Sequence, residues 1–145
     1  MKYKPDWPEA QKPLTALWNH EILDRPCLSV CAPNGKKIKP PPPPENPRDK
    51  WLDPDWIRAD FLARLENTWW GGEVAPSCLT MGGWMLCLGG TPRFDLRTIW
   101  FDTMEVDFSR PSPFRYASDD PWVKAYATLY ESVVKLAGKD DFLVG

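Results

Sequence analysis

The stretch "DPWVKAYATLYESVVKLAGKDDFLVG", residues 120–145, predicts a helix followed directly by a strand. Asp120 and Pro121 form a helix start signal and Gly138 a stop signal, since Asp caps free N–H groups, Pro suits the first turn and Gly ends helices. One face carries apolar side chains at helical spacing: Trp122, Tyr126, Leu129, Tyr130, Val133 and Val134. The apolar run 142–144 reads as a strand, so either it pairs inward or the sequence is cut there. A helix joined to a strand by the short polar link 139–141 is typical of an opening α/β barrel or a doubly wound sheet.

Three elements are predicted in the first half of the chain. A helix starts at or near Pro13, because a proline deeper inside a helix clashes with the carbonyl four residues earlier. A short strand lies within 26–33, a segment bounded by two prolines. A second helix has Asp53 as its N-cap and Pro54 at its first position, and it ends at the glycines 71–72.

A β-hairpin is predicted in the second half. Segment 73–90 is expected to be a strand or loop that leads into a short helical turn. The stretch "PRFDLRTIWFDTMEVDF", 92–108, then alternates in polarity and predicts a hairpin that turns near 95–97. Trp100 and Asp102 fall on one face of this hairpin. Taken alone, the chain is therefore expected to form one α+β unit over 1–145.

Five consecutive prolines, Pro40–Pro44, predict a polyproline II segment at 40–47. We interpret it as a structural connector, because a helix signal follows within a few residues. The alternative is a docking site for an SH3 or WW domain.

Charge and hydropathy exclude several classes of function. The 18 basic and 20 acidic side chains are scattered, with a net charge of −2, so no basic stripe is present for nucleic acid. No run of 18 apolar residues suggests a membrane span, and the N-terminus has no apolar signal segment. We expect a soluble, cytoplasmic protein.

The four cysteines do not have the spacing of a metal site. Three residues lie between Cys27 and Cys31 and eight between Cys78 and Cys87, and His20 is the only histidine. We interpret all four as buried free thiols, and we predict no metal and no cofactor.

Several stretches together resemble the uroporphyrinogen decarboxylase superfamily, which includes tetrapyrrole decarboxylases and cobalamin-linked methyltransferases. They are "HEILDRPCLSV", "RLENTWWGGEVAP", "LGGTPRFDLRTIWFD", "DDPW" and "DFLVG". The resemblance covers nearly the whole chain in order and corresponds to the N-terminal part of that family. It implies an α/β fold in which this N-terminal helical and hairpin segment leads into an incomplete TIM barrel, completed by sequence beyond Gly145.

The candidate substrate contacts are Arg25, Trp100 and Asp102. Asp24, Arg25 and Pro26 loosely match the opening of the decarboxylase substrate segment, and Arg25 can grip a carboxylate with two hydrogen bonds. The alternative for Arg25 is a salt bridge to Asp24 or Glu21. Trp100 and Asp102 are expected to help line the mouth of the barrel that the resemblance implies.

The tryptophans allow two interpretations. Four of them are candidates for an aromatic wall that binds a flat ring: Trp69, Trp70, Trp84 and Trp100. The alternative, which we favour, is that they fill a core.

Two functions follow. The first is the N-terminal part of an enzyme that decarboxylates a tetrapyrrole or transfers a corrinoid-linked methyl group, inactive alone and prone to self-association. The second is a non-catalytic interaction module that uses the polyproline run or an exposed tryptophan surface. The sequence identifies no catalytic residue.

Overall fold

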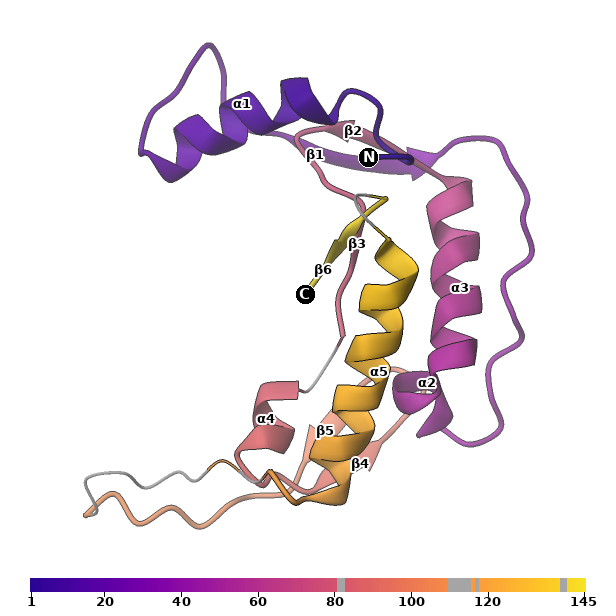
Figure 1. Ribbon diagram of the computed structural model, residues 1–145, viewed down its shortest axis with the longest axis vertical. Coiled ribbons are helices and arrows are strands. Elements are labelled where there is room, and N and C mark those ends of the chain that lie inside the picture. The colour runs from indigo at the N-terminus through magenta and orange to yellow at the C-terminus, as the bar shows by residue number, and fades with distance from the viewer. Residues whose placement is uncertain (81–82, 110–115, 117, 139–140) are drawn as a thin grey trace.

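The computed structural model describes residues 1–80, 83–109, 116, 118–138 and 141–145. Within these ranges the chain forms five helices and six short strands, and the strands make three separate two-stranded sheets without a closed barrel. The β1–β2 pair and α1 lie at one end of the long axis and the β4–β5 hairpin at the other (Figure 1). Helices α3 and α5 run between these ends. None of these helices is both long and apolar enough to cross a membrane.

Helix α1, Trp7–Trp18, begins earlier than Pro13 predicts. Pro8 occupies the first turn, where its missing N–H is harmless, and Pro13 lies inside the helix. The predicted start is wrong because an interior proline removes only one backbone hydrogen bond, and burial of Ala10 and Ala16 holds the helix in place. Before the helix, the buried Lys4 donates to the Trp70 carbonyl at 3.1 Å.

The C-terminal end of α1 closes in a Schellman motif. The His20 N–H donates to the Leu17 carbonyl at 3.0 Å, and the Glu21 N–H donates to the Ala16 carbonyl at 2.8 Å. His20 has φ of 60°, the left-handed conformation that glycine adopts most easily. His20 therefore occupies a position at which glycine is usually found.

Helix α3, Pro54–Asn67, starts as predicted and ends sooner. The Asp53 carboxylate accepts hydrogen bonds from the N–H groups of Asp55 and Trp56, at 2.9 and 3.3 Å. The predicted end at 71–72 is wrong, because Thr68–Gly72 is strand β2. Threonine and tryptophan favour extended backbone, and this segment finds a partner strand.

That partner is strand β1, Ser29–Pro33, which confirms the strand predicted within 26–33. It pairs antiparallel with β2, with Ala32 opposite Trp69 and Cys31 opposite Trp70. The Trp69 ring folds over Gly71, where an added Cβ would lie 2.2 Å from it.

The polyproline run joins β1 to a helix that the sequence did not predict, α2, Asp49–Leu52. Prolines 41, 44 and 47 are half-buried, whereas 40, 42 and 43 are exposed, which fits the three-residue period of polyproline II. The indole N–H of Trp56 donates to the Pro42 carbonyl at 2.8 Å. One face of the run therefore lies against the protein, and the segment between β1 and α2 runs alongside α3 in Figure 1.

The apolar run near Gly145 pairs inward. Strand β6, Leu143–Val144, lies parallel to β3, Ser77–Cys78. The Leu143 N–H donates to the Pro76 carbonyl at 2.8 Å, and the Gly145 N–H donates to the Cys78 carbonyl at 3.1 Å. The predicted strand is confirmed, while residues 139 and 140 of the polar link lie outside the described ranges.

Helix α5, Pro121–Ala137, confirms the predicted helix. The Asp120 carboxylate accepts from the Trp122 N–H at 2.7 Å, and Gly138 follows the last turn. Tyr130 and Val134, predicted on the apolar face, are 39% and 45% exposed. Each lies one residue, about 100° around the helix, from a buried residue, so the buried stripe is narrower than predicted.

The core lies between α3, α5 and the β3–β6 pair. It consists of Phe61, Leu65, Cys78, Leu129, Val133, Ala137 and Phe142. The Phe61 and Phe142 rings meet edge to face, with centroids 4.7 Å apart. This contact fixes the strand pair against α3.

The hairpin and the helical turn are also as predicted. Helix α4 spans Gly83–Cys87, and strands β4, Pro92–Phe94, and β5, Ile99–Phe101, pair antiparallel. The Asp95 N–H donates to the Thr98 carbonyl at 3.0 Å and closes the predicted turn. Phe94 packs on Trp122 of α5, with ring centroids 5.3 Å apart.

Candidate functional site

Trp100 and Asp102 lie on the outward face of the hairpin, together with Arg93. Trp100 is directly opposite Arg93 in the strand register and is 66% exposed. Asp102 follows β5 and forms an ion pair with the Arg93 guanidinium. The hairpin therefore presents an indole beside a neutralised ion pair.

Arg25 grips a carboxylate, but that of Glu73 in its own chain. Its guanidinium donates two hydrogen bonds to Glu73, at 2.9 and 2.6 Å, and the Leu28 N–H donates a third at 2.7 Å. The salt bridge predicted to Asp24 or Glu21 is wrong, because the pairing of β1 with β2 brings Glu73 to Arg25.

This grip changes the acidity of Glu73, whose side chain is buried. The hydrogen bonds from Arg25, then that from Leu28, lower the pKa of Glu73 from 4.5 to about 2. The same contact raises the pKa of Arg25. Glu73 thus stays ionised and tied to the α1–β1 loop.

The predicted substrate contacts do not form one cluster in this structure. Arg25 lies beside the end of β2, at the α1 end of the molecule, whereas Trp100 and Asp102 lie at the hairpin end (Figure 1). Trp100 and Asp102 are neighbours, and Arg25 is remote from both.

Most of the four candidate tryptophans are not buried in the core. Trp69, Trp84 and Trp100 are 55%, 71% and 66% exposed, so the core interpretation is wrong for them. They belong to β2, α4 and β5; on β2 and α4 other residues, Trp70 and Leu86, occupy the buried side. Trp70 alone of the four packs against the core, and its indole N–H is inaccessible and without a described hydrogen bond.

The cysteines are free but not uniformly buried. Cys78 is buried, Cys27 and Cys87 are half-buried and Cys31 is exposed, so the prediction of four buried thiols holds only for Cys78. Cys31 lies on β1, Cys78 on β3 and Cys87 on α4, and the spacing of the cysteines does not reveal which side of each element is buried. In the part of the chain that is described, no three His, Cys, Asp or Glu side chains are grouped so as to hold a metal ion.

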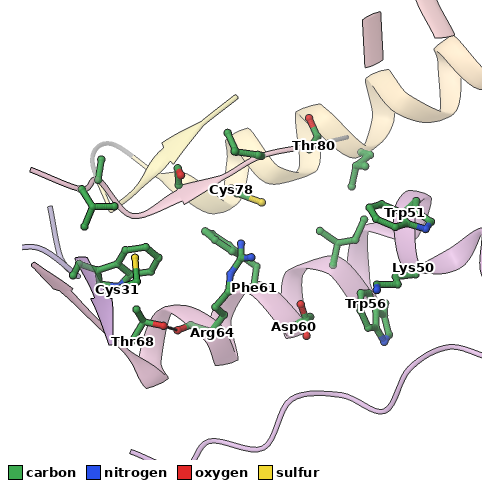
Figure 2. A pocket seen from close by; sticks show the side chains of 17 residues that line it. Cys31, Lys50, Trp51, Trp56, Asp60, Phe61, Arg64, Thr68, Cys78 and Thr80 are labelled. Carbon is green, nitrogen blue, oxygen red and sulfur yellow. Dashed lines mark hydrogen bonds between the residues drawn. The ribbon is translucent and has the colours of Figure 1, made fainter. Parts of the chain in front are cut away.

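A cavity of about 690 Å³ runs along α3; Trp70 lines it, whereas the predicted substrate contacts Arg25, Trp100 and Asp102 do not. We call it the α3 groove. Its larger apolar side chains are Trp51, Trp56, Ile57, Phe61, Trp70 and Leu129. In Figure 2, Cys31 and Thr68 lie at one end, Trp51, Lys50 and Trp56 lie at the other, and Arg64 stands between them.

Two cations line the groove, Arg64 and Lys50, and neither forms a described ion pair. The Arg64 guanidinium lies 5.0 Å from the centre of the Phe61 ring, and no ion pair joins it to any described carboxylate. Burial raises the pKa of the Cys78 thiol, and Arg64 opposes that shift from across the groove. Lys50, at the far end, already donates to the Leu96 carbonyl.

Only one wall of this groove can be predicted from the sequence. Ile57, Phe61, Arg64 and Thr68 follow one another at helical spacing, which marks a single face of α3. The opposite wall comes from β2, β3 and the segment between them, and their position depends on pairing with distant strands. Spacing along α3 gives no information on that wall.

No protein-family model, curated protein or solved structure matches this chain.

Proposed function

We propose that this chain is the N-terminal part of a uroporphyrinogen decarboxylase-like enzyme, inactive alone. The whole enzyme would act in the cytoplasm on a tetrapyrrole by decarboxylation, or on a corrinoid-linked methyl group by transfer. The observation that carries the proposal is the parallel pairing of β3 with β6, whose connection passes through α4, the hairpin and α5. Parallel strands joined by a helical crossover are the repeating unit of a TIM barrel.

The exposed sides of this strand pair support the same proposal. Parallel sheets are normally covered on both faces, yet Leu79 and Leu143 are 69% and 45% exposed. Further barrel strands would cover them. On this proposal Trp100 and Asp102 are substrate contacts at the barrel mouth, and Arg25 contributes by holding the preceding loop through Glu73.

The test is ligand binding by the 145-residue chain. One ring stacked on an exposed tryptophan contributes about 1 kcal/mol, whereas a micromolar complex needs about 8 kcal/mol. We expect no binding of a tetrapyrrole or corrinoid tighter than roughly millimolar, with affinity gained when a barrel continuation is present. Quenching of tryptophan fluorescence measures this directly. Saturable micromolar quenching that Trp100→Ala abolishes would contradict the proposal, because the site would then be complete in this chain.

A second candidate is an interaction module. The exposed prolines at 40, 42 and 43 favour it, since two faces of the polyproline helix are open to a partner. NMR titration of labelled SH3 and WW domains with the chain tests this. Pro43→Ala should weaken binding, whereas Pro44→Ala, on the half-buried face, should chiefly affect the packing of the run.

A further inference from the structure

The α3 groove combines an apolar lining with two cations, Lys50 and Arg64, and one carboxylate, Asp60. Asp60 also lines it but forms no ion pair with Arg64, and the Lys50 ammonium is held by a backbone carbonyl. Figure 2 shows Arg64 extending from α3 toward the opposite wall. The Arg64 guanidinium lies beside the Phe61 ring and the buried Cys78 thiol. Its N–H groups are therefore available to donate to an acid group that enters from solvent.

The dimensions of the groove indicate the shape of the occupant. A cavity of 690 Å³ is within the usual range for small-molecule sites. Along α3 the groove extends from Trp56 to Arg64, about 12 Å at 1.5 Å per residue, and it continues to Thr68 at the start of β2. Ile57 and Phe61 precede Arg64 on α3, and Leu129 lines the groove from α5.

From these observations we infer that the α3 groove binds an elongated apolar monocarboxylate. The acid group pairs with Arg64, and the apolar body lies along Phe61 and Ile57 toward Trp51. Lys50, Asp60 and Arg64 together give the lining a net charge of +1, which matches a single acid group, whereas a diphosphate or nucleotide carries more negative charge than the groove balances. This site is independent of the proposed enzyme function, because the groove is lined by neither Trp100 nor Asp102.

The experiment compares two dansyl probes that differ only in charge: a dansyl-labelled long-chain carboxylic acid and its methyl ester. Each is titrated into the 145-residue chain, and energy transfer to the dansyl group is measured from the nine tryptophans, of which Trp51, Trp56 and Trp70 line the groove. We expect saturable one-to-one binding of the acid, and weaker binding of the ester by about tenfold, the usual effect of one charge-assisted hydrogen-bonded pair.

Three variants locate the acid group. Arg64→Gln should weaken binding of the acid about tenfold and leave binding of the ester unchanged. Arg64→Lys should retain most of the affinity, since it keeps the charge. Arg58→Gln, on an exposed position of the same helix outside the groove lining, is the matched control and should change neither. Thermal melts of all three variants check that each is folded.

Equal affinity for acid and ester would overturn the inference. So would an Arg64→Gln variant that binds the acid as tightly as the unmodified chain, or the absence of saturable binding. Failure here leaves the proposed enzyme function intact, because that proposal is tested with tetrapyrroles and Trp100.

Discussion

Arg25 holds Glu73 in a two-pronged ion pair that spans 48 residues of sequence. Glu73 also accepts the Leu28 N–H, so one buried carboxylate connects the end of β2 to the loop that enters β1. The arrangement makes the position of the N-terminal segment dependent on the charge of a single side chain.

Acid should therefore loosen the fold through Glu73. Its pKa is lowered from 4.5 to about 2 by folding, so its stabilising contribution is complete above about pH 5 and is lost as the pH falls toward 2. Glu73→Gln should cost about 1–3 kcal/mol at neutral pH and flatten the decline in stability between about pH 5 and 2. Urea unfolding followed by circular dichroism across this range measures both effects. Glu21→Gln, an exposed position on the same loop, should leave the profile unchanged, and an equal flattening there would contradict the assignment.

The Schellman motif at His20 predicts a stabilising substitution. Because φ of 60° is strained for a side chain with a Cβ, His20→Gly should raise the free energy of unfolding by about 0.5–1 kcal/mol. His20→Ala keeps the Cβ and should give no such gain. If both variants lose stability equally, the histidine side chain itself supports the helix end.

Two glycines under aromatic rings should respond differently to alanine. A Cβ on Gly83 would lie 2.2 Å from the Tyr126 ring, whose hydroxyl is fixed by a 2.7 Å hydrogen bond with Thr80. Gly83→Ala should therefore cost about 1–3 kcal/mol. Gly71→Ala meets the Trp69 ring at the same distance, but that ring is 55% exposed and can turn into solvent, so its cost should be smaller. Thermal melts rank the two variants, and a larger loss for Gly71→Ala would show that the Tyr126 ring moves more easily than the Trp69 ring.

Exposed apolar side chains beside the β3–β6 pair predict self-association. Leu143 is 45% exposed on a strand whose outer edge has no described partner strand. Leu143→Lys should weaken association about tenfold or more, because a lysine disfavours strand-to-strand contact. Leu28→Lys, at the β1–β2 end, serves as the control and should have less effect. Light scattering over a dilution series measures this, and a monomer at all concentrations in the unmodified chain would contradict the prediction.

The sequence predicts elements whose signals are local. Asp53 with Pro54 and Asp120 with Pro121 start α3 and α5 as predicted, because an N-cap acts within three residues of itself. Alternation likewise locates the β4–β5 hairpin, whose two strands are adjacent in sequence.

These local signals do not predict features that depend on residues far away in the sequence. Thr68–Gly72 follows α3 without a break, and only pairing with Ser29–Pro33 makes it a strand. The same pairing gives Arg25 its carboxylate. The α3 groove was missed for this reason also, since its two walls come from segments that the sequence pattern treats separately.

The parallel pairing of β3 and β6 affects how the chain emerges during synthesis. Ser77 and its partner Leu143 are separated by about 66 residues, so at roughly 5–20 residues per second β3 waits about 3–13 s for its partner strand. During that interval Cys78, which is buried in the folded chain, has neither β6 nor α5 to cover it. A nascent chain stalled before residue 121 should therefore bind chaperones that recognise apolar segments more strongly than a chain that has released Gly145.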